Sequence, residues 1–123
     1  MTIIYKDHNG VEVDALKTVG GGMSIGGEQT TVLDVDGHYY TVLSGTEYQR
    51  IMFQLGPVPS AGVNGLTNEA LLAILIHRTK FLDAKFGCDE NKRAISHMEE
   101  ALVNLEVRTA RRMVRGVEGR EVV

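Results

Sequence analysis

The sequence has few of the residues that build disulfides, rigid turns and large aromatic cores. Its 123 residues include one cysteine, two prolines, four tyrosines, three phenylalanines and no tryptophan. A single cysteine excludes an internal disulfide, which is typical of a reducing compartment. The chain also lacks an apolar run of about 18 residues, the length of a transmembrane helix, and a signal-peptide pattern at its start. We therefore expect a soluble cytoplasmic protein.

Residue patterns that mark catalytic or metal sites are absent as well. The histidines His8, His38, His77 and His97 show neither the Cys-x-x-Cys nor the His-Glu-x-x-His spacing of a metal site. Cys88 lies at a predicted helix start with no nucleophile partner suggested by the sequence, so we expect a packed thiol. We predict a non-enzymatic protein with no catalytic residues, no metal site and no cofactor.

Residues 1–55 alternate short apolar runs with turn signals, as antiparallel β-structure does. Asn-Gly and Asp-Gly pairs favour the positive φ angles of a two-residue hairpin turn. A strand at 48–55 should follow a third turn, and the prolines after it should end the sheet. The three predicted turns are Asn9-Gly10, Asp36-Gly37 and Ser44-Gly45-Thr46.

The remaining residues predict a long helical hairpin after a loop at 60–65. Its helices should span 66–86, with Thr67 as the N-cap, and about 26 residues between Asp89 as the N-cap and Gly116 as the stop. The apolar stripe of the second helix continues at the same spacing into polar residues at both ends. That stripe contains Ile95, Met98, Leu102 and Leu105, and its extension contains Asn91, Thr109 and Arg112. The predicted fold class is α+β, with an antiparallel β domain at 1–59 and the hairpin at 60–123.

The first helix is apolar around most of its circumference, which is more than one partner helix can cover. Leu71, Leu72, Ile74, Leu75 and Ile76 follow one another almost without interruption. We expect this surplus face to pack against the β half, a second copy of the chain, or both. A homo-oligomer follows from the last two alternatives.

Two segments could contact an anionic ligand. Five glycines lie within residues 20–27, but they lack the ending of a P-loop and the Gly-x-Gly-x-x-Gly register; a hairpin connection and a ligand-contacting loop both fit. The chain has a formal net charge of -3, yet arginines gather near its end, either as a solvated helix terminus or as an anion site. These arginines are Arg108, Arg111, Arg112, Arg115 and Arg120.

Aromatic and basic side chains on the hairpin would together suit a nucleotide. A phenylalanine such as Phe81 can stack on a base, an asparagine such as Asn91 can pair with an adenine edge, and arginines can hold a pyrophosphate. Phe81 and Arg108 should lie near opposite ends of the hairpin, so two hairpins would have to pair across a two-fold axis to bring them together. A core phenylalanine and surface arginines are the alternative.

The segments 53–59, 64–72, 86–91 and 108–119 resemble phage Thoeris anti-defence proteins of the first described type. They read Phe-Gln-Leu-Gly-Pro-Val-Pro, Asn-Gly-Leu-Thr-Asn-Glu-Ala-Leu-Leu, Phe-Gly-Cys-Asp-Glu-Asn and Arg-Thr-Ala-Arg-Arg-Met-Val-Arg-Gly-Val-Glu-Gly. The resemblance is close across about 53–119 and looser over the β half. The hairpin is also similar to that of phage anti-CBASS sponges. Where the family commonly has Gly-Pro at the hairpin turn, this chain has Ala84-Lys85.

The resemblance implies a sponge that sequesters glycocyclic ADP-ribose, the signal made by bacterial TIR proteins, in the cytoplasm of the infected host. It implies dimers or hexamers, and cyclic di- or trinucleotides are further ligands left open. Phe81 and Arg108 would stack on adenine, Asn91 would read the base, and Arg112 would contact phosphate or ribose. Gly22 and Met23 would help close the pocket. No membrane or polymeric nucleic acid partner is expected.

Two other functions remain as alternatives. An enzyme that cleaves the same signal would have to use groups that the sequence does not reveal. A small nucleic-acid-binding protein would use the arginines between 108 and 120 and would show a steep salt dependence.

Overall fold

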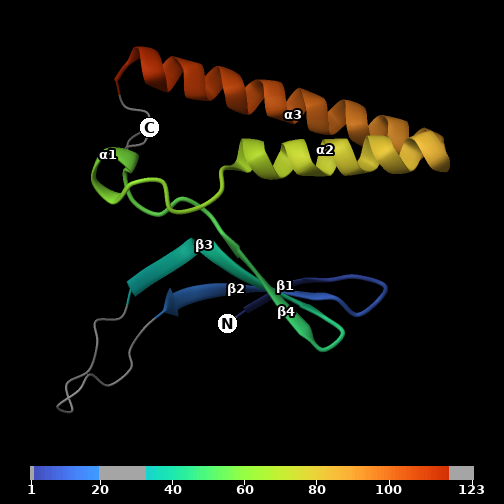
Figure 1. The fold of residues 1–123 in the computed structure, drawn as a ribbon, viewed down its shortest axis with the longest axis horizontal. Coiled ribbons are helices and arrows are strands. Elements are labelled where there is room, and N and C mark those ends of the chain that lie inside the picture. The colour runs from blue at the N-terminus through green and yellow to red at the C-terminus, as the bar shows by residue number, and fades with distance from the viewer. Residues whose placement is uncertain (1, 20–32, 117–123) are drawn as a thin grey trace. The chain divides into compact units, whose positions relative to one another are not determined.

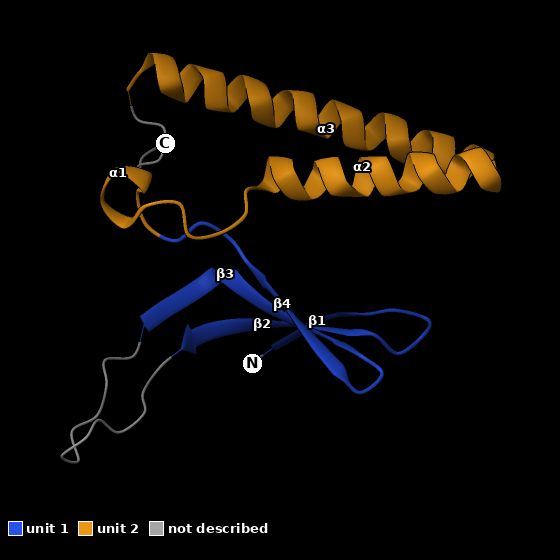
Figure 2. Cartoon of the chain, viewed as in Figure 1, with its two compact units in different colours: residues 1–55 blue, residues 56–123 orange. Residues whose placement is uncertain are grey.

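The computed structural model describes residues 2–19 and 33–116 of the chain. These residues form four strands followed by three helices (Figure 1). The chain divides into two compact units, Met1–Leu55 and Gly56–Val123 (Figure 2). The first unit is a sheet and the second contains the helices, so the predicted α+β class is confirmed. The strands are β1 Thr2–Lys6, β2 Glu12–Val19, β3 Leu33–Ser44 and β4 Glu47–Met52; the helices are α1 Val58–Ala61, α2 Asn68–Lys85 and α3 Asp89–Val114.

The four strands form one antiparallel sheet in the order β1-β2-β3-β4. Neighbouring strands in the sheet are also neighbours in the sequence, which makes the sheet a meander. The β1–β2 hairpin is confirmed, but its turn is longer than the predicted two residues because Lys6 pairs with Glu12. The Asp7 carboxylate accepts the N–H groups of Asn9 at 2.8 Å and Val11 at 3.0 Å, and these bonds hold the wider loop.

The predicted hairpin at Asp36-Gly37 is wrong, because β3 runs through both residues. Gly37 has a φ of +83°, and the pairing of β3 with β2 shifts register there. The extra residues form an irregularity in one long strand, and β3 bends part-way along its length (Figure 1). The predicted turn at Ser44-Gly45-Thr46 is confirmed: Gly45 and Thr46 form a two-residue turn, and Ser44 pairs with Glu47. A positive-φ glycine suits a bulge as well as a turn, which explains the misassignment.

A short helix, α1, follows the sheet where the sequence predicted only a proline stop and a loop at 60–65. Pro57 is its N-cap residue and Pro59 lies in its first turn. Prolines are tolerated there because the first N–H groups of a helix have no intrahelical acceptor. The helix ends at Gly62, whose φ is +72° and whose N–H donates to the carbonyl of Val58 at 2.9 Å.

The hairpin of α2 and α3 begins and ends close to the predicted bounds. The Thr67 hydroxyl accepts the N–H of Ala70 at 3.1 Å, so the predicted cap is confirmed. The predicted cap of α3 is wrong by one residue: Cys88 is the N-cap and Asp89 is the first helical residue. α3 has 26 residues, and Gly116 follows its C-cap with a φ of +72°.

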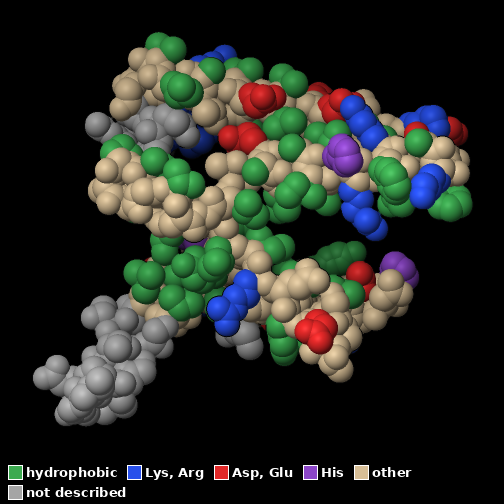
Figure 3. Space-filling view, viewed as in Figure 1, with side chains coloured by type: hydrophobic (Ala, Val, Ile, Leu, Met, Phe, Trp, Pro, Cys, Tyr) green, Lys and Arg blue, Asp and Glu red, His purple; other side chains and the backbone are tan. Residues whose placement is uncertain are grey.

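The apolar core is small in both units. Of the described hydrophobic side chains, the buried ones are Val35 in the sheet, with none of its surface exposed, and Ile76 in α2, with 8% exposed. Many large apolar side chains on the hairpin remain exposed, and Figure 3 shows hydrophobic groups uncovered along α2. The surplus apolar face predicted for the first helix is therefore present. None of the helices that the structure describes is long and apolar enough to cross a membrane.

Candidate functional site

Three polar contacts show how the two hairpin helices are aligned. The Thr109 hydroxyl donates to the Glu69 carboxylate at 3.2 Å, at the end of the hairpin where α2 begins. Lys80 pairs with Glu99 at 3.2 Å, and Lys92 pairs with Asp83 at 3.3 Å near the connection. The helices are therefore antiparallel. We call the end that contains residues 86–88 the turn end, and the end that contains Glu69 and Thr109 the arginine end.

The stripe of α3 faces α2 as the spacing predicted. Ile95, Met98, Leu102 and Leu105 are half-buried, and so are the polar residues Asn91 and Thr109. The stripe finishes at Arg112, which is the most buried residue of α3, with 6% of its surface exposed. The seam is therefore apolar in its middle and polar at both ends. At the arginine end, Arg112 lines an open surface of the hairpin.

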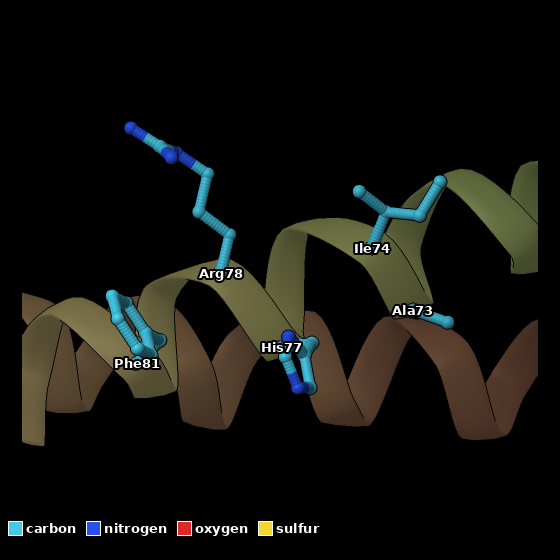
Figure 4. Close-up of a pocket in the computed structure, with 5 residues that line it drawn as sticks. All are labelled: Ala73, Ile74, His77, Arg78 and Phe81. Carbon is cyan, nitrogen blue, oxygen red and sulfur yellow. The ribbon is translucent and has the colours of Figure 1, made fainter.

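An open hollow of about 530 Å³ lies along the middle of α2, and Phe81 lines its edge nearest the turn end. It is lined by Ala73, Ile74, His77, Arg78 and Phe81 (Figure 4). Figure 4 shows Ile74, Arg78 and Phe81 projecting from the same side of α2, away from the α3 ribbon, as a spacing of three and four residues requires. Phe81 is 55% exposed. An exposed ring next to a cation offers a stacking surface to a flat, negatively charged molecule.

Asn91 lies in the first turn of α3, at the same end of the hairpin as Phe81. Its N–H donates to the Cys88 sulfur at 3.4 Å, and its side chain is half-buried. Cys88 itself is exposed, so the prediction of a packed thiol is wrong. Its exposure follows from its position, because an N-cap residue lies outside the packed part of the helix.

The arginine end has its own hollow, of about 290 Å³, on α3. Among the residues that the structure describes, no acidic side chain lines it. Because four guanidinium groups gather there without a carboxylate among the lining residues, the surface favours an anion with several oxygen atoms. Arg108 and Arg112 differ within this group: Arg108 is exposed, whereas Arg112 is buried. The lining residues are Asn104, Val107, Arg108, Arg111, Arg112 and Arg115.

Within one chain the two hollows do not form one site. Phe81 is twelve residues along α2 from Glu69, the residue that contacts Thr109. At 1.5 Å per residue this separates Phe81 from the arginine end by about 18 Å along the helix axis. The structure therefore brings Phe81 and Asn91 to one end and Arg108 and Arg112 to the other. The remaining predicted ligand residues, Gly22 and Met23, lie outside the described residues.

Two site features were missed by the sequence analysis. His77 lines the hollow beside Phe81, and the Lys85 ammonium lies 4.7 Å from the centroid of the Phe81 ring. The spacing of Phe81 and Lys85, four residues on one helix, is the signal that could have revealed the second contact. Within the described part of the chain, no group of three or more His, Cys, Asp or Glu side chains could hold a metal ion.

A further hollow, of about 330 Å³, lies on the sheet unit. Tyr39, Thr41, Arg50 and Met52 are among its lining residues. The Thr41 hydroxyl is buried and has no hydrogen-bond partner among the residues that the structure describes. This concave surface belongs to the first unit.

A known phage protein is similar in sequence to this chain over more than half of the chain's length. The two are 51% identical over 70 residues, and the phage protein is named "Thoeris anti-defense 1", from Bacillus phage SBSphiJ7. The predicted resemblance is confirmed. The match covers 56% of this chain and 49% of the phage protein, so the chain spans about half the length of this Thoeris anti-defence relative. No protein-family model matches the chain.

Proposed function

We propose that the chain is a phage anti-defence protein that binds and sequesters glycocyclic ADP-ribose without cleaving it. Capture would remove the signal that activates the host's Thoeris effector, in the cytoplasm of the infected cell. The observation that carries this proposal is the 51% identity to a phage protein named for Thoeris anti-defence. The hairpin supports it with a hollow on α2 that is lined by Phe81 and a second hollow at the arginine end.

The site is completed by a second copy of the chain. Two hairpins paired antiparallel across a two-fold axis would place Phe81 of one beside Arg108 of the partner subunit. Apolar side chains available for such pairing are exposed on both helices, among them Ile74 at 56% and Val103 at 57%. Symmetry would produce two identical pockets for each pair of chains. Dimers are the smallest assembly that meets this requirement, and hexamers would be built from them.

Each side chain has a role that its chemistry supports. Phe81 and Arg108 stack on the two faces of adenine, and Asn91 reads the edge of the base. Arg112 binds a phosphate or ribose oxygen, and its burial holds the guanidinium in place before the ligand arrives. Gly22 and Met23 complete the proposed set.

The energetics favour a shared pocket over a single hollow. A sponge that competes with a receptor at nanomolar affinity needs about -12 kcal/mol of binding free energy. One stacked face supplies roughly 1–3 kcal/mol and each charge-assisted hydrogen bond about 1.5–3 kcal/mol. Either hollow alone falls short after the cost of association, whereas both together reach the required scale.

The test is to mix the purified protein with glycocyclic ADP-ribose, remove free ligand, denature the protein by heat and analyse what is released. We expect intact ligand in a stoichiometric amount. Recovery of fragments would make the protein an enzyme, and no depletion at all would contradict the proposal. The same assay with a cyclic dinucleotide tests whether a second ligand class binds at a separate site.

Matched variants make this test specific to the arginine hollow. Arg108→Ala should abolish retention, because it removes one stacking partner of the base. Arg93→Ala is the control, since Arg93 is exposed on the same helix at the turn end and pairs only loosely with Glu90, at 4.0 Å. An equal loss of retention in both variants would show that positive charge in general, rather than Arg108, is responsible for binding.

A further inference from the structure

Lys85 covers part of the Phe81 ring in this chain. Its ammonium lies 4.7 Å from the ring centroid, within the distance at which a cation is attracted to an aromatic face. The two residues are four positions apart near the end of α2, so both project from neighbouring points on one side of the helix.

The contact leaves the two faces of the ring unequal. Long side chains on a helix lean towards its N-terminus, so Lys85 approaches Phe81 from the C-terminal side. The hollow on α2 is lined by Phe81 and by residues that precede it, from Ala73 to Arg78, and Lys85 is not among them (Figure 4). The face of the Phe81 ring that Lys85 leaves open therefore borders the hollow, and the face that Lys85 covers is directed towards the turn end.

Phe81 also lies between two cations. Arg78 precedes it by three residues and Lys85 follows it by four. Phe81 is 55% exposed and sits at the edge of a hollow rather than in a packed core. An exposed ring of this kind keeps freedom of rotation about its side-chain bonds, and ordering it on binding costs free energy.

The geometry points to Lys85 as a positioning residue for the nucleobase. It holds the Phe81 ring by its covered face, so that the other face is presented to a base entering the hollow, and it adds positive charge beside the phosphates of the ligand. This inference rests on the proposed function, because it assumes that a nucleotide stacks on Phe81. It extends that function by assigning to this chain a cation that reduces the cost of ordering the ring.

The test is to measure the affinity for glycocyclic ADP-ribose by calorimetry for wild type, Lys85→Met, Lys85→Arg and Lys80→Met. Methionine keeps the length and packing of lysine but has no charge. We expect Lys85→Met to weaken binding roughly three- to tenfold and Lys85→Arg to stay within about twofold of wild type, because arginine also stacks on an aromatic face. Lys80→Met removes the same charge from the same helix, where Lys80 pairs with Glu99, and should match wild type.

A second measurement separates positioning from a general effect of charge. In the free protein, the ring current of Phe81 should shift the proton resonances of the Lys85 ε-methylene upfield, and Phe81→Leu should remove that shift. Affinity losses of equal size in Lys85→Met and Lys80→Met, or an unshifted Lys85 methylene, would overturn the inference while leaving the sponge proposal intact. If wild type fails to bind the ligand, the proposed function fails, and the inference fails with it.

Discussion

The two ends of the hairpin hold their charged residues in different ways. At the arginine end, Arg112 is buried and Thr109 is hydrogen-bonded to Glu69. At the turn end, Phe81 is more than half exposed and Lys85 lies over it at the surface. The arginine end therefore joins ligand binding to the packing of the helices, whereas the turn end keeps Phe81 and Lys85 outside that packing. Substitutions at the two ends should separate these effects.

The largest effect is expected for Arg112→Ala. Removing a side chain that is 6% exposed leaves a void and unpaired neighbours at the end of the seam, which should lower the free energy of unfolding by about 2–4 kcal/mol. Ligand affinity should also fall roughly 10- to 150-fold, since a preorganised anion contact of about 1.5–3 kcal/mol is lost. Urea denaturation followed by calorimetry checks both values. Unchanged stability would show that Arg112 is not part of the seam.

Phe81→Ala should affect binding and spare stability, which is the opposite pattern. The exposed ring contributes little to the core, so the free energy of unfolding should change by less than about 1 kcal/mol. Loss of one stacked face should weaken binding roughly 10- to 100-fold. Urea denaturation and calorimetry again check the two values. A large loss of stability would mean that Phe81 is a packing residue, which is the alternative that the sequence left open.

The sequence predicted the helical unit well because local signals decide it. Thr67 supplies an oxygen to cap α2, Gly116 adopts the positive φ that follows a helix end, and the stripe from Asn91 to Arg112 repeats at helical spacing. The cap, the helix stop and the stripe each depend only on residues that are neighbours along the chain. The role of Cys88 as N-cap was harder to predict, because aspartate caps helices better than cysteine does. The Asp89 carboxylate lies instead in the first turn, where the helix dipole still favours it.

The sequence was less informative about the sheet, because strand pairing depends on residues that are distant along the chain. Asp36-Gly37 has the composition of a turn, but β3 pairs with β2 on one side and with β4 on the other. These partners keep the strand continuous and turn the glycine into part of a bulge. The exposure of Phe81 was equally hidden, since α2 is apolar around most of its circumference and its pattern does not identify the face that meets α3.

Thr109→Val tests the polar end of the seam with a smaller change. The Thr109 hydroxyl donates to Glu69 at 3.2 Å in a partly buried position, so valine, which has the same shape, should destabilise the protein by about 1 kcal/mol. Thr79→Val is the matched control: its hydroxyl bonds only to the Leu75 carbonyl of its own helix, at 2.7 Å, and should change stability little. Equal values from denaturation of the two variants would remove Thr109 as a link between the helices.

The smallest effect, and one of opposite sign, is expected for Cys88→Ser at the turn end. The Cys88 sulfur accepts the Asn91 N–H at 3.4 Å, as a weak acceptor in the position where serine is strongly preferred. Serine should therefore stabilise the protein by a few tenths of a kcal/mol to about 1 kcal/mol, whereas Thr67→Ala at the other helix start should cost about 1 kcal/mol. Thermal unfolding of both variants gives the comparison. If serine destabilises the protein, the thiol has a role that its exposed position does not suggest.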